Sequence, residues 1–500
     1  MRFRQLSVFA AIAALAFVAS CQKKSDDYLR FIPDDAVVVV GTNVQSLLDK
    51  SDVLSHQQVK DAIISSAEQE LGSAGVQLVK SIVDDPAESG LDLSKDIYFW
   101  MEDINRGNGG FVMALSDKDK FMNLIDVTDT SGDPMKFTSY NGYMIGEDDE
   151  IGVAIGDGFA LIYGGTSAAT SLDALKNKLE EKTEDNFSTS ATYKKMASLG
   201  ADMTMMFSLE ELVEGSGYAQ AYGSLPKDMP LADVDGIVGL TFEAGKVVTD
   251  WSYHSETGEW DKWVKENASN VDKVDGTMMD YFGQDALGVL FCSIDGKAVS
   301  KMLEQYPEYA NMYDQLDLPF DLDRLLSTID GQIGIGVNSF NLIPEVVLCA
   351  EVSNEDIMNT MTAQLGGTEV AEGKYVANVE MLSIYYGMED GKFYASLSPN
   401  SREGLKAADP SFADNKHSGT ARGSYGYVGF NMKAFMMLPF AENLRYEVGT
   451  TGFTLLKSID YIELYATDLA GGKLVVYTNS NENPLKIVTD LLIGAHLDRG

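Results

Sequence analysis

Two Asp-Gly pairs constrain the fold of this chain more than any other feature. Asp157-Gly158 lies between two short apolar runs, 152–155 and 159–163, and Asp390-Gly391 lies between two similar runs. Such a pair is typical of a two-residue type I′ hairpin turn, because both turn positions need positive φ. Strands joined by a tight hairpin are antiparallel. The sequence therefore predicts antiparallel sheets and argues against a doubly wound parallel sheet.

The two pairs belong to a longer pattern that occurs twice. An apolar strand-like run, 36–40 or 287–292, leads into a segment with helical spacing, 44–50 or 297–303. Further pairs of segments recur in the same order: 93–100 with 329–336, 111–125 with 346–365, 203–213 with 425–437, and 234–246 with 459–473.

This shared order predicts an internal duplication, with the join in the polar stretch 265–276. We expect a first half over residues 31–270 and a second half over residues 271–500. Hairpin-linked strands with helices between some of them indicate the α+β class, so each half is predicted to be a mainly antiparallel sheet with helices packed on one face. Two separate cores and one shared sheet are both compatible with the sequence.

The N-terminus has the pattern of an export signal. Arg2 and Arg4 precede an apolar run of thirteen residues, Leu6–Val18, which is too short as a helix to span the roughly 30 Å membrane core. The following Ala-Ser-Cys resembles the lipobox of a bacterial lipoprotein signal peptide. That resemblance implies cleavage between Ser20 and Cys21, and acylation of Cys21 as a stable anchor in the lipid bilayer.

Residues 21–30 are expected to form a polar tether. Its adjacent acids, Asp26 and Asp27, are similar to the signal that sends many Bacteroidetes lipoproteins to the outer leaflet of the outer membrane. We therefore expect an outer-membrane lipoprotein on the cell surface, with the periplasmic face as the alternative.

The first residues of the body carry a second resemblance. Phe31–Val40, leading into Asn43–Leu47, resembles the start of Bacteroidetes outer-membrane lipoproteins that are grouped only as a domain of unknown function. Together with the lipobox and the duplicated plan, the resemblance covers nearly the whole mature chain. It implies no catalytic residues, because that family has no established activity.

The sequence contains no pattern that predicts catalysis, a metal site or a cofactor. The histidines at positions 56, 254, 417 and 496 are scattered and form no zinc-binding pair. Asp250, Ser252 and His254 alternate along one predicted strand, which spaces their parallel side chains about 6.5 Å apart, too far for a hydrogen-bonded triad. Cys292 and Cys349 lie in apolar strands and are expected to be buried thiols, with a disulfide as the alternative.

Four aromatic residues are the only candidate ligand site. Trp251, Tyr253, Trp260 and Trp263 lie close together in the sequence and could stack on sugar rings if they were exposed. The alternative, which the helical spacing of Trp260 and Trp263 favours, is that they pack in the core.

Charge narrows the range of partners. A formal net charge of −38 disfavours binding to nucleic acids and anionic lipid headgroups. We expect a non-enzymatic binding or scaffold protein that presents a surface or a cleft between its halves to an envelope protein or a glycan. A hydrolase built from remote carboxylates and a purely structural envelope component are the alternatives.

Overall fold

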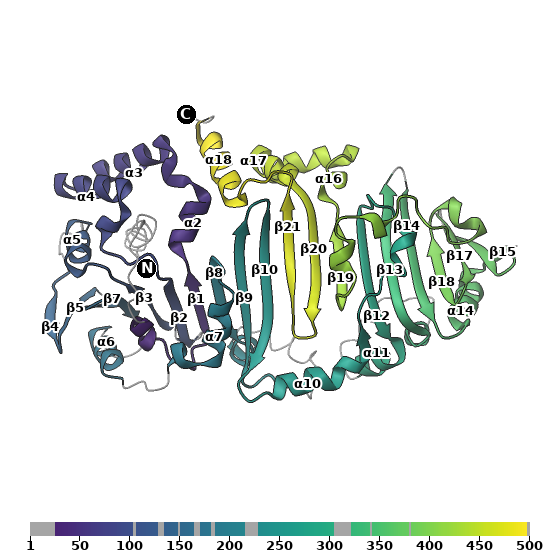
Figure 1. Cartoon of the computed structure of the whole chain (residues 1–500), viewed down its shortest axis with the longest axis horizontal. Helices are drawn as coiled ribbons and strands as arrows, with labels where there is room; N and C mark the ends of the chain where they lie inside the picture. The colour runs from purple at the N-terminus through teal and green to yellow at the C-terminus, as the bar shows by residue number, and fades with distance from the viewer. Residues whose placement is uncertain are drawn as a thin grey trace.

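The strands form one continuous sheet. A computed structural model describes residues 26–103, 107–128, 135–148, 151–164, 171–181, 186–215, 229–304, 322–340, 343–379 and 382–497. Within them, 21 strands hydrogen-bond into a single sheet, and all of the pairings are antiparallel. Figure 1 shows this sheet extending along the long axis of the molecule. The predicted α+β class with an antiparallel sheet is confirmed.

The strands of the two halves follow the same spatial order. From one edge to the centre, the sheet contains β4 (Thr138–Tyr140), β5 (Tyr143–Asp148), β6 (Ile151–Gly156), β7 (Phe159–Gly164), β3 (Asn108–Ala114), β2 (Ile97–Asp103), β1 (Val38–Thr42), β8 (Met203–Ser208), β9 (Val234–Glu243) and β10 (Lys246–Ser255). From the other edge it contains β15 (Thr368–Ala371), β16 (Lys374–Val379), β17 (Leu382–Glu389), β18 (Lys392–Ser396), β14 (Pro344–Val352), β13 (Ile329–Phe340), β12 (Gly288–Asp295), β19 (Gly426–Phe430), β20 (Ile459–Asp468) and β21 (Gly471–Thr478). The two-residue β11 (Val271–Asp272) pairs with the end of β12.

The last strands of the two halves pair with each other and join the halves into one sheet. β10 and β21 are antiparallel, with Val248 opposite Val475 and Thr249 opposite Leu474. Both valines are buried, at 6% and 3% exposure. The sequence was compatible with two separate cores or one shared sheet, and this junction shows that the halves share one sheet.

Helices lie at the ends of the strands and over the outer parts of the sheet. Those of the first half are α2 (Val44–Ser51), α3 (Gln57–Glu70), α4 (Ser73–Asp84), α5 (Lys118–Thr128), α6 (Ser171–Glu180), α7 (Ala191–Ser198), α8 (Leu209–Gly215) and α10 (Glu259–Asn267). Those of the second half are α11 (Gly296–Leu303), α13 (Leu322–Leu326), α14 (Asp356–Leu365), α15 (Ser418–Ala421), α16 (Met432–Phe435), α17 (Leu444–Ser458) and α18 (Pro484–Leu497). In Figure 1, α18 lies beside α2 above the sheet and α10 leads towards α11 below it, while no helix crosses the visible side of β9, β10, β21 and β20.

The prediction that helices cover only one face of each half is wrong. In β6, Ala154 belongs to a core cluster with residues of α6 and α7, whereas Val153 and Ile155 point to the other side and join a cluster with residues of α2, α4 and α5. In β14, Cys349 and Leu348 are divided between two clusters in the same way. The reason is that these outer strands are apolar at successive positions, so both of their faces need cover.

The two Asp-Gly hairpins form as predicted, but with different turns. Asp390 and Gly391 both have positive φ, 50° and 75°, as a type I′ turn requires. At the first hairpin only Gly158 does, with φ of 85°. The register is nevertheless the same, with two residues between the paired ends of the strands.

Within the part of the chain that the structure describes, no helix has the length and apolar content needed to cross a membrane.

Candidate functional site

Three of the four candidate aromatic residues, Tyr253, Trp260 and Trp263, form a packed cluster. Trp260 is 4% exposed, and its ring centroid lies 5.2 Å from that of Tyr253 and 5.5 Å from that of Trp263. Trp251 is half-buried on β10, and its six-membered ring fills the space where a side chain at Gly472 would project. No flat, fully exposed ring face is available for a sugar in this arrangement.

Asp250 and His254 of β10 lie beside different residues of the neighbouring strands. Asp250 forms an ion pair with Lys473 across the pairing of β10 with β21, with 2.6 Å between Asp250 Oδ1 and Lys473 Nζ. His254 lies opposite Asp235 in register, and Asp235 accepts a hydrogen bond from Thr192. Asp250 and His254 thus face separate neighbours, as expected from strand geometry.

The two cysteines are free thiols on different strands. Cys292 lies on β12 and Cys349 on β14, with β13 between them. Burial raises the pKa of Cys349 to about 12 and also raises that of Cys292. The disulfide alternative is therefore wrong, and both side chains behave as small apolar groups.

Ser20 and Cys21 lie outside the described residues, so the lipid attachment site remains a prediction from the sequence. Among the residues that are described, no three His, Cys, Asp or Glu side chains come together in a way that could hold a metal ion.

A polar cavity of about 420 Å³ lies in the first half, next to α6. Lys178 is only 7% exposed, and its Nζ lies 2.8 Å from Glu102 Oε1 and 2.9 Å from Glu181 Oε2. Glu102 also accepts hydrogen bonds from the Tyr163 hydroxyl at 2.8 Å and from the Trp100 indole at 3.2 Å.

The protonation of Glu102 follows from these contacts. Burial acts to raise its pKa, but the hydrogen bond and the positive charge of Lys178, with the two aromatic donors, outweigh burial and hold the pKa below its usual value. Glu102 is therefore a carboxylate bound to a lysine rather than a protonated acid that could donate to a substrate.

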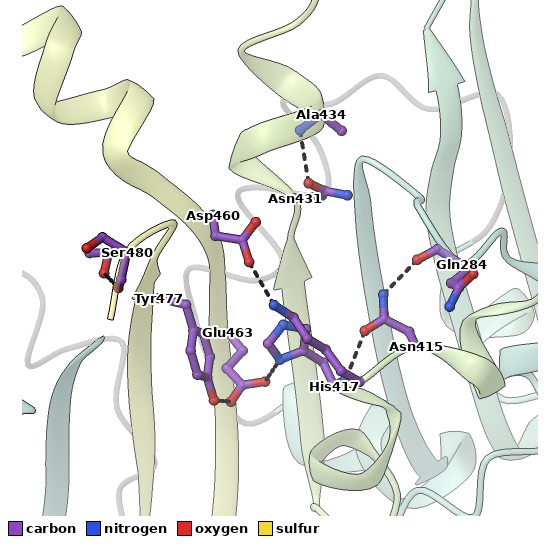
Figure 2. A network of polar contacts seen from close by, with 11 residues as sticks. Gln284, Asn415, His417, Asn431, Ala434, Asp460, Glu463, Tyr477 and Ser480 are labelled. Atoms are coloured by element: carbon purple, nitrogen blue, oxygen red, sulfur yellow. Dashed lines mark hydrogen bonds and ion pairs between the residues drawn. The ribbon is translucent and has the colours of Figure 1, made fainter. Parts of the chain in front are cut away.

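A second polar cluster is buried in the second half and lies around Glu463 of β20 (Figure 2). Glu463 is 1% exposed and accepts a hydrogen bond from the Tyr477 hydroxyl at 2.6 Å. His417 Nδ1 lies 3.1 Å from its other carboxylate oxygen, and the Tyr427 hydroxyl lies 3.3 Å from that same oxygen. The His417 ring stacks on Tyr461 with 4.0 Å between centroids.

These contacts connect separate parts of the second half. Burial raises the pKa of Tyr427 and Tyr477, so both phenols stay protonated and act as donors to Glu463. Beside them, Lys416 forms an ion pair with Asp460, with 2.7 Å between Nζ and Oδ2. The cluster holds the segment before α15 against β19, β20 and β21, which is a structural role.

A third distinctive feature is one side of the central strands, which we call the open face. It is defined by two rows of side chains that lie opposite one another in register across the sheet. The first row is Phe111, Phe99, Val40, Met205, Val238 and Trp251. The second row is Ile335, Leu290, Val428, Leu464, Leu474, Thr249, Leu240, Met203, Thr42 and Ile97.

The open face is uncharged and only partly covered. Neither row contains an acidic or basic residue. Five of their side chains are among the exposed large hydrophobics: Phe111 45%, Met205 36%, Ile335 38%, Val428 40% and Leu464 42%. On the other side of the same strands, Val39, Trp100, Met206, Phe291 and Tyr427 are at most 1% exposed. An antiparallel sheet normally carries polar side chains on a solvated face, so this apolar face is unusual.

Comparison with known proteins identifies the family. A family model described as a domain of unknown function, DUF4836, matches residues 28–485. This chain belongs to that family. The resemblance inferred from the sequence is thus confirmed as far as a domain of unknown function that covers most of the chain, and no curated protein matches the DUF4836 chain.

Among solved structures, the DUF4836 chain is similar to the protein TP0453 in several crystal forms. Crystal form IV matches at 14% identity with a TM-score of 0.28, covering 46% of this chain and 81% of that one. Form III matches at 12% identity with a TM-score of 0.29, covering 50% and 90%. These scores are too low to support any argument about fold or function.

Sequence reasoning missed the three places where the DUF4836 chain has unusual chemistry. Glu463 could have been noticed as a lone acid within the apolar strand 461–465. The open face could have been noticed from strands that are apolar at successive positions, such as 38–40 and 205–207. The Lys178 cavity had no such signal, because Glu102 and Lys178 are far apart in the sequence and come together only in the fold.

Proposed function

We propose that this protein is a membrane-anchored, non-enzymatic binding protein that holds a protein partner on its open face. The observation that carries this proposal is an uncharged, partly exposed apolar surface that continues across both halves of one sheet. Covering apolar surface with a partner removes it from water, which lowers the free energy of the complex. Large exposed apolar patches on folded proteins are frequent sites of protein contact. Its apolar side chains also offer few hydrogen bonds to sugar hydroxyls, which favours a protein over a glycan.

Internal duplication accounts for the extent of this surface. The ten strands of residues 31–270 and the corresponding ten strands of residues 271–500 have the same order, and the last strand of each half pairs with that of the other. Antiparallel pairing of equivalent strands relates the halves by an approximate two-fold axis near Val248 and Val475. The two halves then place equivalent contact patches next to each other on the same face of the sheet.

Anchoring through Cys21, after cleavage behind Ser20, would place this face at the outer membrane, on the cell surface. The test is a Cys21→Ala variant, followed by separation of membranes and soluble material. We expect the wild-type protein in the membrane fraction and the variant in the soluble fraction after cleavage or retained as an uncleaved precursor. A processed variant that stays with the membrane would contradict lipid anchoring.

A binding role is favoured over hydrolysis by the state of the cavity carboxylates. Lys178 lies between Glu102 and Glu181, so both carboxylates contact an ammonium group. A glycosidase needs one carboxyl group that is protonated and free to donate.

Photocrosslinking in intact cells tests the proposed contact surface. A benzophenone amino acid is placed at Val428 on the open face or at Val379, which has nearly the same exposure, 40% against 39%, but lies on β16 outside both rows. We expect a crosslinked protein at Val428 that is absent at Val379 and is lost when Leu464→Asp is added. Equal crosslinking at both positions, or none at Val428, would refute a partner on the open face.

A further inference from the structure

We propose that the open face binds one elongated amphipathic protein segment, apolar on one side and flanked by Lys or Arg, that lies across the strands and contacts both halves. This inference rests on the proposed function and specifies the partner. It follows from the length of the apolar rows, their lack of charge and their position across the junction.

The length of the open face indicates an elongated partner. Its second row runs from Ile335 on β13 to Ile97 on β2 and crosses ten strands. Adjacent strands are about 4.8 Å apart, so the row is about 43 Å long. An α-helix of about 28 residues has that length at 1.5 Å per residue. One apolar side of such a helix would cover the row up to Ile97, which packs against the cluster that contains residues of α2, α4 and α5.

The charge of the protein selects among apolar partners. The chain carries a formal charge of −38, and none of it lies in the two rows. A second copy of this chain would bring a second −38, and an anionic membrane surface would also be repelled. A segment with an apolar side and basic flanks fits both the uncharged rows and the negative net charge. Its apolar side covers the rows, and its basic residues are attracted by the acidic protein.

The exposed positions are divided between the halves. Phe111 and Met205 belong to the first half, and Ile335, Val428 and Leu464 to the second. Between them, Thr249 and Leu474 lie opposite each other at the junction and are half-buried. A segment that lies across the junction meets exposed apolar groups on both sides of it, so substitutions in either half should weaken the same binding event.

Binding of a model segment to the full mature chain tests the proposal. The probe is a fluorescein-labelled 28-residue amphipathic helix made of Leu and Lys, and its affinity is measured by fluorescence anisotropy at physiological salt. Met205→Ser and Val428→Ser remove apolar surface in the first and second half without changing charge. Val379→Ser is the matched control, because Val379 has a similar exposure, 39%, and lies outside the rows. Circular dichroism and urea unfolding verify that all variants fold.

We expect each of the two open-face substitutions to weaken binding by about tenfold, the control by less than twofold, and a Leu/Glu helix of the same design not to bind. The proposal would be overturned if Val379→Ser weakened binding equally, if only one half mattered, or if the Leu/Glu helix bound as tightly. Stronger association with a second copy in sedimentation, or with zwitterionic phosphatidylcholine vesicles in flotation, would also overturn it. A positive crosslink at Val428 without binding of the Leu/Lys helix would reject the segment while leaving the proposed binding role intact.

Discussion

Removing one hydroxyl group from the Glu463 cluster should measurably destabilise the protein. Tyr477→Phe keeps the ring, which packs edge-on against His417 with 4.8 Å between centroids, and deletes only the donor that lies 2.6 Å from Glu463 Oε1. Glu463 is 1% exposed, so water has little access to replace the lost donor. A hydrogen bond to a charged group contributes about 1.5–3 kcal/mol, and we expect a loss of about 2 kcal/mol in the free energy of unfolding.

Urea unfolding followed by tryptophan fluorescence provides the measurement, with Tyr446→Phe as the control. Tyr446 is 87% exposed, so the same change there should cost less than about 0.5 kcal/mol. In a Glu463→Gln background the effect of Tyr477→Phe should shrink by about 1 kcal/mol, because a neutral acceptor forms a weaker hydrogen bond. A loss below about 0.5 kcal/mol for Tyr477→Phe, or an undiminished loss in the Gln background, would refute the reasoning.

Three further predictions concern other buried groups. Glu102 has a lowered pKa in the folded protein, so its contribution to stability is present above its unfolded pKa and is lost as the pH falls through its folded pKa. Lys178→Met should therefore lower the urea midpoint most at pH 7 and least near pH 4. A difference between variant and wild type that does not depend on pH would contradict the ion pair. Cys292 and Cys349 should both titrate with a thiol reagent in urea without reductant, and Cys349 should remain unreacted in the native protein at pH 8. Trp260→Ala should cost about 3–5 kcal/mol in urea unfolding, because this 4%-exposed side chain leaves a cavity; a cost below about 1 kcal/mol would indicate an exposed ring instead.

Local structure was predictable where the signal lies within a few residues. The hairpin at Asp390-Gly391 was predicted from two residues that tolerate positive φ, and it forms with both in that region. The helix predicted over 44–50 is α2, which ends one residue later. The turn at Asp157-Gly158 shows the limit of such reasoning, because the same residue pair adopts a different turn in another tertiary setting.

The covering of sheet faces was not predictable in the same way. Period-two spacing says which side chains of a strand share a face, and it assigned Asp250, Ser252 and His254 correctly to one side of β10. It does not say which other element lies over that face. For this reason the helices were expected on one face, whereas residues of α2, α4 and α5 and residues of α6 and α7 pack on opposite faces in the first half.

The antiparallel strands and the order of the helices and strands could be predicted from the sequence, because turn chemistry and side-chain periodicity act over short distances along the chain. Four features follow from tertiary packing alone: β10 pairs with β21, Lys178 contacts Glu102, Glu463 is buried, and the open face is partly uncovered. These features depend on contacts between residues that are far apart in the chain. Which strand edges meet and which faces are covered follows from the packing of the whole molecule.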